Sequence, residues 1–368
     1  MSVDYTAPVE AKLLAMREEY QQILRSPRRW SLRDLFSTPE LDIVEYCRDL
    51  TPNRFGEPAC REVERWCRQH RIWLEPGATH YNSMTPYLHP NTVTVERMTV
   101  IGLFNAILYW LNDTVGRDKH AHLSHTQQQH ARATIDRLCD MLETGTVPPE
   151  PVPVEVATHE FLQRLSRDAD PRWLQETLAS TVAHLRPANR DQNARARGQL
   201  LDVQDYIALR ADMSGMYPVI AFCEYGRDTY LQWGPITATG LDTDLLRLRQ
   251  LTVQIGGLMN DLFSFEKECI TGGADSNLIP ILLLNSTDAT LADAIEHAAA
   301  LVREQLTEFH SLRTGLTARR AALADTALAT IIGEHIDDLT GAVQATWVWQ
   351  VRTARYKRSS IFTENHQH

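Results

Sequence analysis

Apolar residues recur every three or four positions along most of the chain, and strictly alternating apolar and polar residues are almost absent. Such spacing is typical of amphipathic helices and favours an all-α fold. Residues 98–111 are apolar nearly all round, which predicts a buried central helix. The full pattern predicts helices over residues 10–24, 58–69, 98–111, 125–143, 155–165, 171–185, 203–222, 241–269, 290–312, 321–335 and 336–357.

Proline and glycine residues mark where these helices break or bend. A proline-rich connector spans residues 148–153, and Gly215 and Pro218 are kink points within the predicted helix 203–222. Candidate metal ligands lie on both sides of the connector, so one domain is more economical than two. We therefore expect an N-terminal tail and first helix over residues 1–25, a single α-helical domain over residues 26–358, and a C-terminal tail over residues 359–368.

The composition of the 368-residue chain is typical of a globular protein, with 43% hydrophobic and 23% charged residues. A formal net charge of -10 argues against nucleic acid as a partner. No apolar stretch of about 18 residues is present, so we expect no membrane insertion. The six cysteines form no C-x-x-C pair, which predicts reduced thiols in a cytoplasmic protein. We expect a monomer or a homodimer.

Residues 260–268 carry the strongest chemical signal in the chain. Asn260, Ser264 and Glu268 are spaced four residues apart. Each step of four residues advances about 40° around an α-helix, so the three side chains line one face. An amide oxygen, a hydroxyl and a carboxylate are hard ligands, which select Mg²⁺ or Mn²⁺ over soft metals. The alternative is a solvated stripe, since such residues often share an exposed helix face.

A second candidate metal site follows the apolar helix 98–111. Asp113 stands directly after it, and an isolated buried charge there would be costly unless a cation accompanied it. Asn112 and Asp118 are secondary candidates, because Asp113 and Asp118 would lie about 140° apart on a continued helix. The alternative for Asp118 is a surface acid paired with a neighbouring basic residue.

The string Asn-Asp-Leu-Phe-Ser-Phe-Glu-Lys-Glu at residues 260–268 resembles the N-D-x-x-S-x-x-x-E metal-binding triad of class I terpene synthases of the microbial type. The resemblance covers about residues 94–356. It implies helices around a deep apolar cavity, and three Mg²⁺ ions or Mn²⁺ in their place. The family's aspartate-rich motif, D-D-x-x-D or D-D-x-x-x-E, matches only in part. Asn112 replaces its first aspartate, and Gly116 and Arg117 stand where the distal acid is expected.

The resemblance also assigns residues to the substrate's diphosphate. Arg210 corresponds to an arginine that senses the diphosphate, and Gly215 to a helix break whose backbone approaches the substrate. Arg355 and Tyr356 resemble an Arg-Tyr pair that closes over the diphosphate, and Lys267 is a further candidate. The alternative for Arg210 is a surface ion pair with Asp205 or Asp212, and the alternative for the C-terminal pair is a basic helix end that complements the helix dipole.

Aromatic side chains are candidates for the cavity wall, because an aromatic face attracts a cation without reacting with it. Phe104, Tyr109 and Trp347 are the candidates we place there, although any one such aromatic residue is more often ordinary core packing.

The resemblance implies metal-dependent ionisation and cyclisation of a C15 or C20 prenyl diphosphate, with release of diphosphate. The catalytic candidates are then Asp113, Arg210, Arg355 and Tyr356. A prenyl chain-elongation enzyme is an alternative, although such enzymes use two aspartate-rich motifs. A non-catalytic helical protein that binds a prenyl diphosphate is the other, and the degenerate motif at Asn112 permits it.

Overall fold

The structure is a computed structural model that describes residues 6–114, 124–188 and 200–366. Its described residues form helices and contain no β-sheet, only three isolated β-bridges. The predicted all-α class is therefore confirmed. The α-helices are α1 (Thr6–Arg25), α2 (Leu32–Phe36), α3 (Ile43–Tyr46), α4 (Gly56–Gln69), α5 (Gly77–Asn82), α6 (Thr85–Leu88), α7 (Val95–Thr114), α9 (His125–Thr144), α10 (Pro153–Asp168), α11 (Pro171–Ala188), α13 (Val203–Met213), α14 (Met216–Arg227), α15 (Trp233–Ala238), α16 (Asp242–Phe265), α17 (Leu278–Asn285), α18 (Leu291–Ala321) and α19 (Thr326–Arg352).

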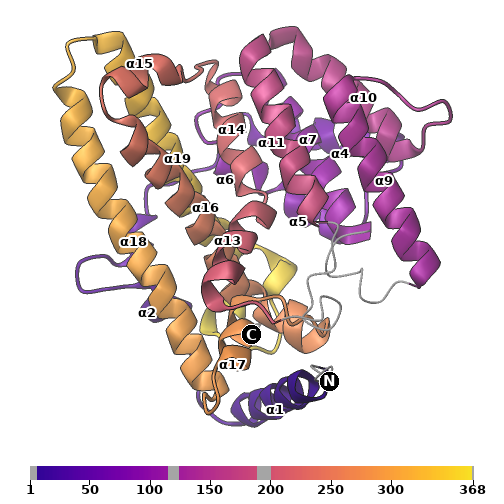
Figure 1. The fold of residues 1–368 in the computed structure, drawn as a ribbon, viewed down its shortest axis with the longest axis vertical. Helices are drawn as coiled ribbons and strands as arrows, with labels where there is room; N and C mark the ends of the chain where they lie inside the picture. The colour runs from indigo at the N-terminus through magenta and orange to yellow at the C-terminus, as the bar shows by residue number, and fades with distance from the viewer. Residues whose placement is uncertain (1–5, 115–123, 189–199, 367–368) are drawn as a thin grey trace, which may run out of the picture.

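Two groups of helices make up the bundle (Figure 1). In one group, α16 packs against α13, α17, α18 and α19. In the other, α7 packs against α4, α5 and α10, and α9 and α11 pack beside each other. Helix α14 contacts both α7 and α16 and so joins the two groups. Each group has its own cluster of buried apolar side chains.

Two of the helix breaks expected from the sequence can be compared with the structure. Helix α13 stops before Gly215, whose φ of 75° is a left-handed conformation that glycine adopts without strain, and α14 starts directly after it. The break predicted at Gly215 is thus confirmed. The predicted break between residues 335 and 336 is wrong, because α19 runs through it as one helix. His335 and Ile336 are both buried there, and neither residue breaks a helix.

The C-terminal segment differs from the tail that the sequence suggested. Ser360, Ile361 and Phe362 are all 0% exposed. The backbone N–H of Trp30 donates to the carbonyl of Ile361 at 2.9 Å, and the N–H of Thr363 donates to the carbonyl of Trp30 at 2.9 Å. This segment is therefore held against the bundle, because Ile361 and Phe362 supply apolar side chains that the core buries.

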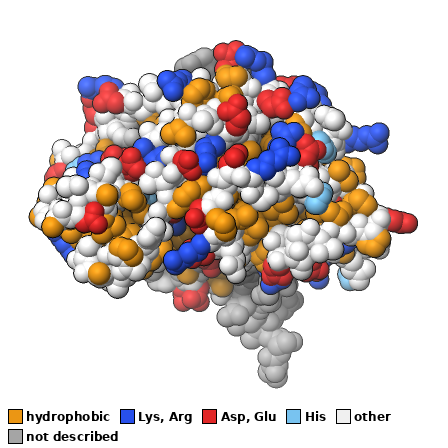
Figure 2. All heavy atoms as spheres, turned by 90° about the horizontal axis from the view of Figure 1, so that it is seen from above, with side chains coloured by type: hydrophobic (Ala, Val, Ile, Leu, Met, Phe, Trp, Pro, Cys, Tyr) orange, Lys and Arg blue, Asp and Glu red, His pale blue; other side chains and the backbone are white. Residues whose placement is uncertain are grey.

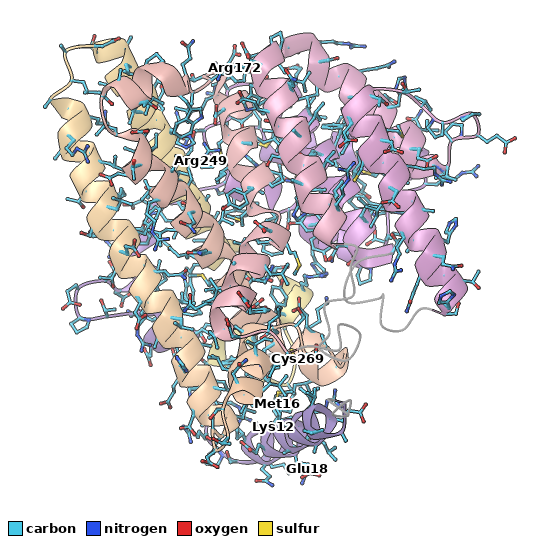
Figure 3. The ribbon with its side chains drawn as sticks, in the orientation of Figure 1. Lys12, Met16, Glu18, Arg172, Arg249 and Cys269 are labelled. Atoms are coloured by element: carbon cyan, nitrogen blue, oxygen red, sulfur yellow. The ribbon has the colours of Figure 1, made fainter. Side chains whose placement is uncertain are left out.

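Helix α1 closes the same end of the bundle as α17 and the C-terminus (Figure 1). Lys12 donates to the carbonyls of Leu283 and Ser286, where α17 ends. Met16 is 2% exposed and belongs to the core. Figure 3 shows Lys12 and Met16 on the side of α1 that faces the bundle, with Cys269 above them.

Charged and apolar side chains are mixed on the surface of the bundle. On the face seen in Figure 2, basic and acidic side chains are interspersed among apolar ones. None of the described helices combines the length and the apolar character that crossing a membrane requires.

Candidate active site

A cavity of about 210 Å³ lies between α7, α11, α13, α14, α16 and α19. Most of its wall is apolar, with leucine, isoleucine, valine and methionine side chains from both groups of helices. Its polar lining includes two guanidinium groups, one carboxylate and several amides. The aromatic lining residues are Tyr81, Tyr109, Trp349 and Tyr356, and the polar ones include Asn112, Arg210, Asn260, Glu268 and Arg355.

Asn260 connects its own helix to three other elements at this cavity. Its Oδ1 accepts a hydrogen bond from Arg210 Nη2 at 3.0 Å. Its Nδ2 donates to Gln350 Oε1 at 2.9 Å and to the Tyr356 hydroxyl oxygen at 3.0 Å. The amide thereby links α16 to α13, to α19 and to the short 3₁₀ helix η2 (Ala354–Tyr356) that follows α19.

The helix that carries Asn260 changes its winding before Glu268. Helix α16 ends at Phe265 and continues as the π-helix η1 (Glu266–Thr271). The sequence predicted an uninterrupted α-helix here. A π-helix turns less per residue, so Glu268 lies more nearly in line with Ser264 than 40° per step implies. Figure 3 labels Arg249 on α16 and Cys269 in η1, near the two ends of this continuous rod.

Asp261, the next residue on the same helix, is buried and does not line the cavity. It is 0% exposed, and its carboxylate accepts from Arg210 Nε at 2.7 Å, from the Tyr206 hydroxyl and from the backbone N–H of Leu278 at 3.0 Å. Arg210 thus pairs with Asp261, not with Asp205 or Asp212 as a surface arginine would. Its Nη1 makes no hydrogen bond within the described residues, which leaves one nitrogen for an anion.

Asp113 occupies the opposite wall, at the last turn of α7. Its Oδ1 accepts from the Tyr81 hydroxyl at 3.1 Å and from Asn112 Nδ2 at 3.3 Å. Burial raises the pKa of Tyr81 well above its ordinary value, so its hydroxyl stays protonated and donates. The Asp113 side chain is 23% exposed and lines a small recess next to the main cavity.

Arg355 and Tyr356 connect the two walls. The Arg355 guanidinium lies 4.2 Å from the ring centroid of Tyr81, and its Nη2 is 3.8 Å from Asp113 Oδ1. The next residue, Tyr356, bonds to Asn260 on the other wall. The predicted pair therefore reaches both candidate metal sites from one turn of η2.

The geometry agrees with what comparison with known proteins shows. The family model described as "Terpene synthase family 2, C-terminal metal binding" matches residues 103–308, more than half of the chain. The chain belongs to this terpene synthase family. The suspected resemblance is thus confirmed, and the matched range includes Asp113, Arg210 and the 260–268 motif.

Relatives of this terpene synthase occur in fungi and in bacteria. Sesquiterpene synthase 6 of Postia placenta is 25% identical over 86% of this chain and 89% of that protein. The (12E)-labda-8(17),12,14-triene synthase of Streptomyces cyslabdanicus is 23% identical over 82% of this chain and 89% of that protein. The matches to sesquiterpene synthases 1 and 2 of Postia placenta cover 56% of the length of those proteins.

Solved structures of similar proteins show the same fold. The T181N variant of cucumene synthase superposes with a TM-score of 0.69 at 20% identity, over 84% of this chain and 98% of that one. Linalool/nerolidol synthase from Streptomyces clavuligerus, in complex with 2-fluorogeranyl diphosphate, gives 0.68 at 19% identity, over 82% of this chain and 100% of that one. The predicted class I terpene synthase fold is confirmed.

The α16 face fits the divalent metal that the family implies. Ser264 is 1% exposed, and its Oγ is a buried atom without a hydrogen-bond partner in the described structure. A buried hydroxyl oxygen that lacks a partner is costly, so a ligand at this place would satisfy it. No group of three His, Cys, Asp or Glu side chains suited to a metal occurs among the described residues. The candidate donors beside Glu268 are therefore the amide oxygen of Asn260 and the hydroxyl oxygen of Ser264.

The other residues proposed from the sequence lie in different places. Gly215 and Tyr109 line the cavity. Phe104 instead packs on Phe222, with ring centroids 4.4 Å apart, and Trp347 packs on Phe263 at 5.7 Å, so the structure puts both outside the cavity lining. Both are large apolar rings on helices buried on several faces, which the sequence pattern does not orient.

Two further placements complete the set. Lys267, in η1, is not among the described residues that line the cavity. Asp118 lies outside the residues that the structure describes.

Sequence reasoning missed Tyr81 and Asp261. Asp261 directly follows Asn260 within the recognised string, so its position was visible but its buried role was not. Tyr81 belongs to a short helix without a motif, and only the fold brings it to Asp113.

Proposed function

We propose that this terpene synthase ionises a linear C15 or C20 prenyl diphosphate in a metal-dependent reaction and cyclises the resulting allyl cation. One observation carries the proposal. Side-chain oxygens of Asn260 and Glu268, the guanidinium groups of Arg210 and Arg355, and an apolar aromatic wall meet at a single cavity. The pattern matches a substrate that has an anionic head and a hydrocarbon chain.

The two walls would hold the metal from opposite sides. Asn260, Ser264 and Glu268 would hold Mg²⁺ on the α16 side, and Asp113, with Asn112 beside it, would hold it on the α7 side. We propose three ions, as in the family, with Mn²⁺ as a substitute. Bound metal supplies charge neutralisation of the diphosphate as the C–O bond breaks.

Three side chains would bind the diphosphate oxygens directly. Arg210 offers the nitrogen Nη1, and its Nε is fixed by Asp261, so the guanidinium is oriented before the substrate arrives. Arg355 and Tyr356 would approach from η2 and cover the head group. Fixed donors of this kind stabilise charge that develops in the transition state without further reorganisation. The head group would thereby leave as a tightly bound anion.

The apolar part of the cavity would then direct the cation. Tyr81 and Tyr109 stack face to face with centroids 3.6 Å apart, and Trp349 and Tyr356 meet edge to face at 6.4 Å. Aromatic faces stabilise a cation through the ring quadrupole. The surrounding leucines and methionines exclude water, which protects the cation from early capture. The wall would thus set which carbon atoms approach each other.

Incubation with prenyl diphosphates tests the proposal. Purified protein would be mixed with geranyl, farnesyl or geranylgeranyl diphosphate, with Mg²⁺ or with EDTA. Gas chromatography–mass spectrometry and a diphosphate assay would follow. We expect a cyclic product from the C15 or the C20 substrate with Mg²⁺ only. Binding without any diphosphate release would favour the non-catalytic alternative, and a longer prenyl diphosphate as product would favour chain elongation.

A further inference from the structure

His184, near the C-terminal end of α11, lines the cavity and has no role in the site described above. Its Nδ1 lies 2.7 Å from the backbone carbonyl oxygen of Asp212. A carbonyl oxygen only accepts hydrogen bonds, so Nδ1 must carry the proton. In the neutral ring the lone pair then belongs to Nε2. The tautomer of His184 is thus set by the end of α13.

The Nε2 atom faces the break between α13 and α14. It lies 3.9 Å from the point where a side chain on Gly215 would begin, and no described residue hydrogen-bonds to it. Burial is the largest cause that lowers the pKa of His184, and the charge of Arg210 acts in the same direction. The Asp212 carbonyl and carboxylate oppose this lowering only in part. The ring therefore enters the reaction neutral, with a free lone pair.

The other polar groups that line the cavity are poorer bases or have other tasks. Asn112, Asn260 and Gln350 carry amides, whose nitrogen atoms are not basic. Arg210 and Arg355 are permanently protonated. Glu268 is the remaining carboxylate of the lining, and the proposed function assigns it to the metal. Among the described lining residues, His184 is the one neutral nitrogen base.

We propose that His184 is a catalytic residue whose Nε2 accepts the proton that ends the cyclisation, an inference that rests on the proposed function. In this step a C–H bond next to the cationic carbon breaks, and its electron pair forms the C=C bond of the product. The proton bonds to the Nε2 lone pair and gives an imidazolium. The nearby released diphosphate can take that proton, which regenerates the neutral ring, so charge and atoms balance.

The His184→Asn variant isolates this role. An asparagine side chain can place its amide nitrogen near the position of Nδ1 and keep the hydrogen bond to the Asp212 carbonyl, yet it offers no base. The matched control is His310→Asn, because His310 is exposed on α18 and outside the cavity lining. Diphosphate release would be measured alongside the product profile for both variants and for the wild type.

We expect the His184→Asn variant to release diphosphate within about twofold of the wild-type rate, since ionisation precedes the proton loss. The share of the main wild-type olefin should fall about tenfold or more, because a positioned base contributes at least that much to its step. Products from other proton losses or from water capture should replace it. The His310→Asn control should leave the profile unchanged.

Several results would overturn the assignment. An unchanged profile in His184→Asn with normal turnover would refute the base and leave the proposed function intact. A wild-type product that is an alcohol alone would also refute it. If the wild type releases diphosphate from no substrate, the proposed function fails and the base fails with it.

A measurement without substrate tests which tautomer of His184 is present before the reaction. Long-range ¹H–¹⁵N spectra of histidine-labelled protein near neutral pH should contain one signal of the Nδ1–H tautomer that His184→Asn removes. A signal of the Nε2–H tautomer for this residue would contradict the proposal, because Nε2 would then have no lone pair to accept a proton.

Discussion

The two walls of the cavity are held in different ways. On the α16 wall, Asp261 is fully buried and fixed by Arg210, Tyr206 and the N–H of Leu278. On the α7 wall, Asp113 is partly exposed and has neutral donors, with the charged Arg355 3.8 Å away. One acid is therefore part of the folded core, and the other lies at a site that a ligand can still complete.

This difference separates two tasks that carboxylates can perform in one site. A buried acid that is paired on all sides orients its neighbours, and its removal leaves an uncompensated charge. A partly exposed acid whose oxygens have unused lone pairs can bind a cation. The comparison therefore predicts that removing Asp261 reduces stability and activity together, whereas changes at Asp113 reduce activity alone.

The largest effect is expected for Asp261→Ala. The change leaves the Arg210 guanidinium buried without its partner, so the free energy of unfolding should fall by about 3–5 kcal/mol. Diphosphate release should be lost as well, because Arg210 is no longer oriented. Urea denaturation followed by circular dichroism measures the first quantity. Asp337→Ala, at an exposed position of α19, is the matched control and should stay within about 0.5 kcal/mol of the wild type.

The next effect is expected for Asp113→Asn. The amide oxygen can still accept from Tyr81, so the free energy of unfolding should not change measurably. Loss of the charge should lower the rate of diphosphate release about 100-fold, the usual size for removing one electrostatic contact to a transition state. Steady-state kinetics at saturating Mg²⁺ would measure this. An unchanged rate would show that Asp113 does not bind the metal. The α7 wall would then have no part in ionisation.

A smaller effect is expected for Ser264→Ala, which tests the unpaired hydroxyl. No described hydrogen bond is lost, so stability should stay within about 0.5 kcal/mol. The Mg²⁺ concentration that gives half-maximal activity should rise about tenfold, within the range seen when a group that supports metal binding is removed. Calorimetric titration with Mg²⁺ and inorganic diphosphate gives a readout without turnover. Ser311→Ala, at an exposed position of α18, is the control, and equal results for both serines would contradict a ligand role.

The sequence predicted the helix face that carries Asn260, Ser264 and Glu268 better than it predicted the segments packed around that helix. The spacing of Asn260, Ser264 and Glu268 is local, so helix periodicity alone could indicate a shared face. The π-helical turn begins at Glu266, whose carboxylate accepts from two residues far away in the chain, Tyr20 at 3.1 Å and the N–H of Ile361 at 2.8 Å. Contacts between such distant segments leave no periodic signal, and for the same reason the packed C-terminal segment resembled a tail.

The sequence also could not orient large apolar side chains. Phe104 and Tyr109 both lie on α7, yet Phe104 contacts Phe222 in the core and Tyr109 faces the cavity. A helix that is apolar on every side gives no indication of which face meets a cavity. The aromatic candidates were therefore the least determined, whereas Arg355 and Tyr356, which were assigned from the resemblance to the family's Arg-Tyr pair, both line the cavity.

The smallest effect is expected for Tyr20→Phe, which tests how firmly α1 holds the π-helical turn. The change removes the hydroxyl that donates to Glu266, while the N–H of Ile361 still donates to the same oxygen. The free energy of unfolding should fall by about 1 kcal/mol, the net value of one buried hydrogen bond. Because Glu266 keeps its second donor, the Mg²⁺ requirement should not change.

Tyr46→Phe is the matched control for this variant. The Tyr46 hydroxyl is buried without a hydrogen-bond partner among the described residues, so its removal should be neutral or stabilising. Urea denaturation of both variants separates the loss of a hydrogen bond from the loss of a hydroxyl group. If the two variants behave alike, the contact between α1 and η1 contributes nothing to stability. The position of the α16 wall would then be held by the hydrogen bonds of Asp261 alone. The side chain of Glu268 would be held no more firmly than that of Asp113.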